Sequence, residues 1–234
     1  MPSKIISTVL TPAIKLWLRS QVENAERLEI NINGGDRQII SGYIPNVFLT
    51  STSVIYQGIH LSEFESIADN IRVNIGQVIK GKPLRLLEPI SIAAKVILEQ
   101  SDLDRSLASP LLSAGLNDFF FNLLATRSLP NLVKFKQHFQ IQWLQIAIDR
   151  NKLILHGNLI NSTRGKIPLT ISSTLGLANP QTLSFDSLKI TTTPRLINMN
   201  LNEFKLDLGP AVAIEELNLL PNRLNCCGRL TVLP

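Results

Sequence analysis

The 234-residue sequence predicts an α+β protein that is built largely from long antiparallel strands. Apolar residues recur at every second position in three segments: Ile90–Leu98, Lys166–Leu177 and Leu224–Val232. Successive side chains of an extended chain leave opposite faces, so each segment forms a ribbon with one apolar and one polar side. A twelve-residue ribbon spans about 40 Å, which exceeds the usual strand length. Such strands predict a highly curved sheet around an apolar interior, filled either by the protein's own helices or by a lipid.

The first predicted element is a helix from Thr11 to Ala25. Thr11 supplies a capping hydroxyl, and Pro12 occupies the first helical position, where its missing N–H costs nothing. The apolar residues of this segment recur three or four positions apart and form one stripe: Ile14, Trp17, Leu18 and Val22. We expect the helix to lie on the concave face of the sheet. Contact of the stripe with a membrane remains the alternative to core packing.

A strand-rich region follows this helix. Its predicted strands are Leu28–Ile32, Ile39–Tyr43, Val47–Thr52, Ile59–Phe64 and Ile71–Ile75. Asn33–Asp36 predicts a turn, and Pro45-Asn46 separates two of the strands. A short helical turn near Val78 leads into a basic loop at Lys80–Pro83.

The middle of the chain predicts a helical insertion. Ser101, with Asp104 three residues later, resembles a capping box, and Ser109-Pro110 predicts a second helix start. Phe119–Phe121 cover about 200° of a helix, more than one core stripe needs. Core packing is the favoured interpretation, and three alternatives explain the extra coverage: burial on two sides, the lining of a cavity, or an exposed apolar patch.

The last part of the chain predicts further strands. The predicted strands are Phe139–Ile148, Leu153–Leu159, Lys166–Leu177, Leu183–Thr192, Ile214–Leu219 and Leu224–Val232. Asp149–Lys152 predicts a hairpin turn between the first two. Pro168 favours an edge position for its strand, because proline has no N–H to donate.

Length alone allows one large domain or two small ones, and the strand alternation favours one domain over residues 1–234, with residues 1–10 expected as a membrane-contacting extension. Hydrophobic residues make up 44% of the chain and charged residues 18%, so a sizeable core can form without disulfides or metal. The net charge is +5, but the basic residues are scattered, which argues against nucleic-acid binding. Cys226 and Cys227 are adjacent and face opposite ways on a strand, so no bridge is expected between them.

The sequence contains no recognisable motif of catalytic or metal-binding residues. His60, His138 and His156 are far apart and have no carboxylate or cysteine at metal-ligand spacing. Asp102 and Asp104 are explained by their favourable place at a helix start. The sequence also lacks a nucleophile elbow, a phosphate loop and a dinucleotide fingerprint. We therefore expect no enzyme, no cofactor and no bound metal.

The N-terminus lacks the pattern of a targeting segment. Lys4 precedes a short apolar run that Ser7 and Thr8 interrupt, so it is too short and broken for a signal peptide. No stretch approaches the roughly 18 apolar residues of a membrane span. The expectation is a cytoplasmic protein that contacts membranes peripherally.

The order of several short motifs resembles the LmeA-like phospholipid-binding family, in particular its cyanobacterial members. The resemblance covers nearly the whole chain. It rests on the Thr11-Pro12 helix, Leu28–Ile32, Ile40–Pro45, Gly58–Leu61, Ile71–Ile75, Gly81–Leu84, Pro89-Ile90, Leu98–Leu103, Leu208–Pro210, Ile214–Leu217 and Gly228–Val232. It implies a fold similar to tubular lipid-binding domains, in which a highly curved antiparallel sheet wraps on a long N-terminal helix. It also implies phospholipid as the ligand, and it transfers no catalytic residues.

The resulting functional prediction is non-catalytic binding, or transfer, of a phospholipid or similar amphiphile in an apolar groove. The expected lining is Ile14, Trp17, Leu18, Val22, Ile92, Ala94, Val96, Phe119, Phe120 and Trp143. The expected contacts with an anionic membrane are Lys4, Ile5, Ile6, Val9, Leu10, Lys15, Arg19, Lys80, Lys82 and Arg85. The alternatives are a structural or assembly protein with a filled core and, third, an enzyme with an unfamiliar site. The alternative for the basic residues is a solvated surface.

Overall fold

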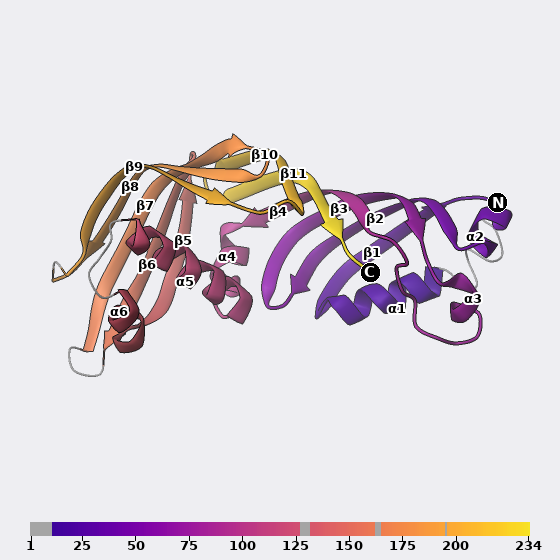
Figure 1. Cartoon of the computed structure of the whole chain (residues 1–234), viewed down its shortest axis with the longest axis horizontal. Helices are drawn as coiled ribbons and strands as arrows, with labels where there is room; N and C mark the ends of the chain where they lie inside the picture. Colours follow the sequence, from indigo (N-terminus) through magenta and orange to yellow (C-terminus); the bar gives the residue numbers. More distant parts are fainter. Residues whose placement is uncertain (1–10, 127–131, 162–164, 195) are drawn as a thin grey trace.

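The computed structural model describes residues 11–126, 132–161, 165–194 and 196–234, and gives only the backbone of residues 17–21 and 132–134. Two open antiparallel sheets dominate it (Figure 1), which confirms the α+β class. The six-stranded sheet has the spatial order β1 (Asn24–Asn33), β2 (Tyr43–Tyr56), β3 (Ile59–Arg72), β4 (Ile90–Glu99), β11 (Arg223–Val232) and β10 (Val212–Leu220). The five-stranded sheet has the order β5 (Gln140–Asp149), β6 (Lys152–Asn161), β7 (Gly165–Asn179), β8 (Thr182–Thr192) and β9 (Asn198–Asp207). The helices of the described ranges are α1 (Thr11–Gln21), α2 (Asp36–Ile40), α3 (Ile75–Val78), α4 (Gln100–Ser106), α5 (Pro110–Ala125) and α6 (Leu132–His138).

The three alternating segments form the strands that the sequence predicts. β4 and β11 pair along their full length, from Ile90 opposite Val232 to Glu99 opposite Arg223. The end of the described chain therefore returns to the sheet that its beginning forms. β7 buries every second side chain from Ile167 to Leu175, as the alternation requires.

Apolar side chains form two buried clusters. The first lies between α1 and the six-stranded sheet and includes Ile14, Ile39 and Ile44. The second lies between α5 and the five-stranded sheet, where Phe120 is completely buried. Figure 1 shows both sheets as curved, with α1 beneath one and α5 beneath the other. Leu219 of β10 belongs to the second cluster, so a strand of the first sheet helps to bury the core of the second. The single-domain organisation stays a prediction.

Polar contacts also join the two sheets, and Gln100 at the start of α4 contributes to them. Its side-chain Nε2 donates to the carbonyl of Ile146 (2.5 Å). The backbone N–H of Asn222, in the turn between β10 and β11, likewise donates to the carbonyl of Ile148 (3.2 Å). The N–H of Ile214 on β10 donates to the carbonyl of Pro180, which lies between β7 and β8 (2.6 Å). These bonds connect β10, β11 and α4 to the five-stranded sheet.

The start of α4 differs from the prediction that Ser101 caps it with Asp104. Glu99 is the N-cap residue, and the carboxylate of Asp102 accepts its backbone N–H (2.9 Å). The same carboxylate accepts the hydroxyl of Ser62 on β3 (2.5 Å) and the guanidinium of Arg105 (2.6 Å). Asp102 is 1% exposed, so one buried carboxylate fixes α4 to the first sheet.

Other predicted boundaries are wrong where long strands bend. Residues 36–40 form α2 rather than a strand, and β2 passes through Pro45-Asn46 without a break. β3 is likewise continuous from Ile59 to Arg72. Ser53 (φ 51°) and Asn70 (φ 54°) adopt positive φ angles inside these strands, so single residues absorb the bends.

Two further expectations concern α1 and Pro168. α1 spans eleven residues and ends before Ala25, because β1 begins at Asn24. A longer N-terminal helix stays a prediction, since residues 1–10 lie outside the described ranges. β7 is the central strand of its sheet, so the edge position predicted from Pro168 is wrong. The N–H of Thr193, just after β8, donates to the carbonyl of Pro168 (3.1 Å), and the residue pairing between β7 and β8 begins at Leu169. The missing N–H therefore falls at the end of that ladder.

Candidate functional site

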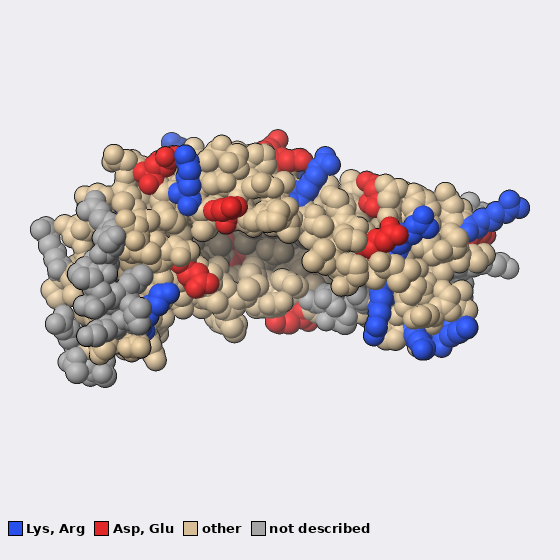
Figure 2. Space-filling model, in the orientation of Figure 1, with Lys and Arg blue, Asp and Glu red and all other residues tan. Residues whose placement is uncertain are grey.

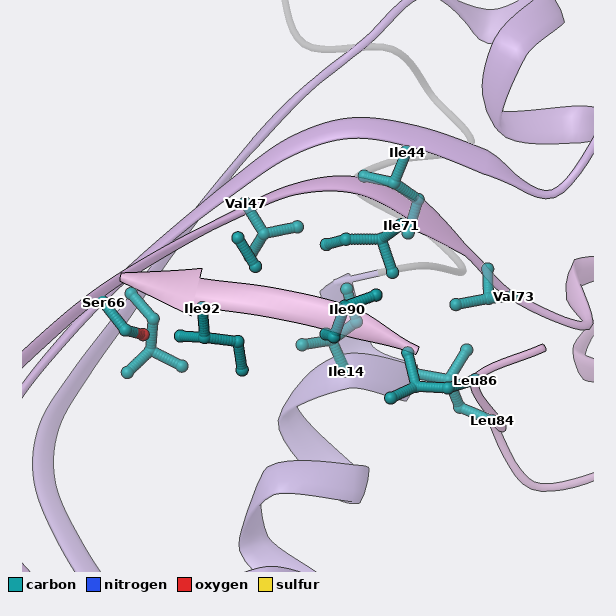
Figure 3. A pocket seen from close by; sticks show the side chains of 12 residues that line it. Ile14, Ile44, Val47, Ser66, Ile71, Val73, Leu84, Leu86, Ile90 and Ile92 are labelled. Atoms are coloured by element: carbon teal, nitrogen blue, oxygen red, sulfur yellow. The ribbon is translucent and has the colours of Figure 1, made fainter. Parts of the chain in front are cut away.

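An apolar cavity of about 100 Å³ lies beneath the six-stranded sheet. Eleven of its twelve lining residues are apolar, and the twelfth is Ser66 (Figure 3). The lining consists of Ile14, Ile44, Val47, Leu49, Ser66, Ala68, Ile71, Val73, Leu84, Leu86, Ile90 and Ile92. They come from α1, from β2, β3 and β4, from the segment between α3 and β4, and, for Val73, from the residue that follows β3.

Strand register explains why space remains here. Cross-strand partners face the same side of a sheet, so Ser66, Ala94 and Gly228 form one row across β3, β4 and β11. The next row contains Ala68 and Ile92. Small side chains at the centre of a curved sheet leave room that branched side chains would fill.

The segment from Leu84 to Leu87 closes one end of the cavity. Leu86 forms an antiparallel bridge with Val73, and the N–H of Leu87 donates to the carbonyl of Arg72 (2.9 Å). In Figure 3, Leu84 and Leu86 lie at one end of the cavity and Ser66 at the other. The cavity is therefore elongated along the sheet.

The structure places the predicted lining in several locations. Ile14 and Ile92 line the cavity. Ala94 and Val96 continue the same face of β4, half-buried, beyond the cavity wall. Val22 is half-buried just after α1, and the side chains of Trp17 and Leu18 lie outside the described residues.

The predicted aromatic residues lie elsewhere. Phe119, Phe120 and Trp143 are buried in the second cluster, so they do not line this cavity. The ring centroids of Phe119 and Phe185 are 4.7 Å apart, and Trp143 Nε1 donates to Asn117 (3.0 Å). Phe119 and Phe120 therefore belong to the core against the five-stranded sheet, and Phe121 packs beside it, partly buried.

Sequence reasoning missed most of the wall. The predicted strands include Val47 but leave Ile44 in the gap before it, although β2 contains both. Leu84 and Leu86 lie at and after the end of the predicted basic loop, outside every predicted strand. Their alternation with Arg85 was the available signal, because it shows an extended segment with two apolar side chains on one face.

The predicted membrane contacts lie on the surface wherever they are described. Lys80, Lys82 and Arg85 are exposed on the segment between α3 and β4, and Lys15 is exposed on α1. Figure 2 shows Lys and Arg side chains at the end of the molecule that carries α2 and α3. The remaining predicted contacts, which lie outside the described residues, are Lys4, Ile5, Ile6, Val9, Leu10 and the side chain of Arg19.

Sequence reasoning did not include two apolar side chains at that end. Ile40 at the end of α2 is 54% exposed, and Ile79 after α3 is 57% exposed. Within the described ranges, no helix has the length and apolar character to cross a bilayer.

The side chains that line the cavity are apolar apart from the hydroxyl of Ser66. In the part of the chain that the structure describes, no three His, Cys, Asp or Glu side chains gather as a metal site. His156 contacts Thr170 (Nδ1 to Oγ1, 3.2 Å). Cys226 is a free thiol, and burial together with the neighbouring Cys227 raises its pKa. The wall thus offers apolar contact and one hydroxyl.

One comparison with known proteins found a match. The family model described as LmeA-like phospholipid-binding matches residues 3–229, nearly the whole chain. Neither the curated proteins nor the solved structures contain a match. The family is described by lipid binding rather than by a reaction, which bears out the resemblance that the motif order indicated. The chain belongs to the LmeA-like phospholipid-binding family.

Proposed function

We propose that this protein binds a phospholipid or a similar amphiphile without catalysis, and that the cavity beneath the six-stranded sheet holds part of an acyl chain. The apolar lining of the cavity carries this proposal. Each buried CH₂ group contributes about 0.8 kcal/mol, so a few methylene groups give useful affinity without elaborate polar recognition.

The rest of the chain would follow the concave face of the sheet. Val96 and Cys226 are cross-strand partners that continue the row pattern past the cavity, and both are half-buried. Half-buried apolar side chains leave surface that a second acyl chain can cover. The hollow visible near the middle of the molecule in Figure 2 lies on the side of the sheet that the helices occupy.

Contact with a membrane surface is part of the proposal. Ile40 and Ile79 expose apolar surface beside the cations Arg37, Lys80 and Lys82. Lysine and arginine near an anionic bilayer contribute about 1 kcal/mol each, and apolar side chains insert between headgroups. This end of the molecule would meet the bilayer from which the lipid is taken or to which it is delivered.

Native mass spectrometry of gently purified protein tests the proposal. We expect a co-purifying mass of one phospholipid that organic extraction removes. Protein that carries no lipid, and that also takes up none from added vesicles, would contradict it. That outcome would favour the alternative of a structural or assembly protein.

A further inference from the structure

A second cavity adjoins the first and has a different chemical character. This cleft has a volume of about 640 Å³, and Leu84 and Leu86 line both spaces. Its polar lining consists of Asn74, Gln77 and Arg85. One extended segment therefore separates an apolar cavity from a cleft that contains a cation.

The alternation of this segment directs its side chains to opposite sides. Leu86 bridges Val73 in antiparallel fashion, so Arg85 and Leu87 leave the face opposite to that of Leu84 and Leu86. Their exposure agrees, because Arg85 is exposed and Leu87 is 58% exposed. The side chain of Arg85 thus leaves the segment on the cleft side.

Asn74 fixes the backbone of Pro83 and Arg85. Its buried side chain accepts the N–H of Arg85 (2.8 Å) and donates to the carbonyl of Pro83 (3.0 Å). The backbone N–H of Asn74 donates to the carbonyl of Arg85 (3.3 Å). Arg85 takes part in none of the ion pairs that the described residues form. A cation on a fixed backbone, with no carboxylate partner among the described residues, is suited to bind an anion.

We propose that the cleft binds the phosphate group of an anionic phospholipid, with Arg85 as the charged donor. The inference rests on the proposed function, because the acyl chain of the same lipid would occupy the cavity. A guanidinium matches two phosphate oxygens at once, and the Nε2 of Gln77 is an additional donor in the cleft. An extended segment is about 5 Å wide, a span that a glycerol linker covers. The lipid would point its phosphate at Arg85 and its acyl chain towards Ser66.

Phosphatidate and diacylglycerol with identical acyl chains test this orientation, because they differ only in the phosphate. We expect wild-type protein to bind phosphatidate at least tenfold more tightly, and Arg85→Gln to remove most of that preference while still binding diacylglycerol. Lys189→Gln, an exposed cation on β8, is the charge-matched control and should keep the preference. An unchanged preference in Arg85→Gln would overturn the inference.

Two further measurements are needed. One tests the proposed lipid binding on which this inference rests, and the other tests whether the cleft is a site for free phosphate instead. Ala68→Leu fills the cavity and should weaken the binding of both lipids. If Ala68→Leu leaves both affinities unchanged, the proposed function itself fails. Inorganic phosphate is the third probe, and we expect it to bind wild-type protein at least a hundredfold more weakly than phosphatidate. Inorganic phosphate that binds as tightly as phosphatidate, and equally well to Ala68→Leu, would identify a phosphate site without a lipid and overturn the inference.

Discussion

Replacing Asp102 by alanine removes the carboxylate that fixes α4 to the first sheet. The side chain of Asp102 is 2% exposed, and it accepts bonds from Ser62, from the backbone of Glu99 and from Arg105. Alanine leaves the Ser62 hydroxyl and the Glu99 N–H without this acceptor, and an unsatisfied donor costs about 1–3 kcal/mol. Arg105 is 59% exposed and regains water, so its loss adds little. We expect Asp102→Ala to lower the free energy of unfolding by about 3 kcal/mol.

The pKa of Asp102 gives this prediction a pH dependence. Burial raises the pKa, but the bonds from Ser62, Glu99 and Arg105 outweigh it and hold the pKa below its ordinary value. A lowered pKa stabilises the fold above the pKa of the unfolded chain, about 3.9, and this stabilisation disappears as pH falls through the folded-state pKa. Wild-type stability should therefore decline more steeply below about pH 4 than that of Asp102→Ala.

Urea denaturation followed by far-UV circular dichroism measures both effects. Ser62→Ala is the matched variant, because it removes one donor and leaves two, and it should cost about 1 kcal/mol. An Asp102→Ala midpoint equal to that of wild type at pH 7 would refute the structural role. Parallel curves for the two proteins between pH 5 and pH 3 would refute the argument from the pKa.

Three other predictions test the membrane surface, the second core and the row of small residues. Lys80→Gln combined with Lys82→Gln should weaken binding to anionic vesicles, measured by flotation, about 30-fold, because each lysine contributes about 1 kcal/mol. The control pair Lys152→Gln with Lys189→Gln should not weaken it. An equal loss in both pairs would show that binding depends only on the net charge of the protein. Phe120→Ala should lower the free energy of unfolding by about 3–5 kcal/mol, measured by urea denaturation, since Phe120 is completely buried. Gly228→Ala should shift β10 or lower the melting temperature, because a Cβ there would lie 2.5 Å from the carbonyl oxygen of Ala213; an unchanged melting temperature would contradict this packing.

The sequence was a good guide to the strands that have one apolar and one polar face. In β4, β7 and β11 one face meets an apolar interior and the other does not, so apolar residues recur at every second position of the sequence. It was a poor guide to α2, where Ile39 is completely buried and its neighbour Ile40 is 54% exposed. Five residues are too few to distinguish a helical period from a strand.

The site was only partly predictable because it depends on pairing between distant segments. Ile14 and Ile92 could be named from their own stripe and ribbon. Ala68 lines the cavity because its register places it between Val47 and Ile92, and a single sequence does not state register. Phe120 was assigned to the groove for the same reason: its helix packs on the five-stranded sheet, whose strands follow it in the chain.

The central claim is that the cavity beneath the six-stranded sheet holds the acyl chain of a lipid. Ala68→Leu adds a branched side chain inside that cavity, whereas Ala93→Leu adds the same side chain on the opposite, exposed face of the sheet. The measurement is the affinity of wild type and both variants for a fluorescent phospholipid, with melting temperatures to confirm folding. We predict that Ala68→Leu melts at or near the wild-type temperature and binds at least tenfold more weakly, while Ala93→Leu binds as wild type does. A folded Ala68→Leu protein with wild-type affinity would contradict the claim.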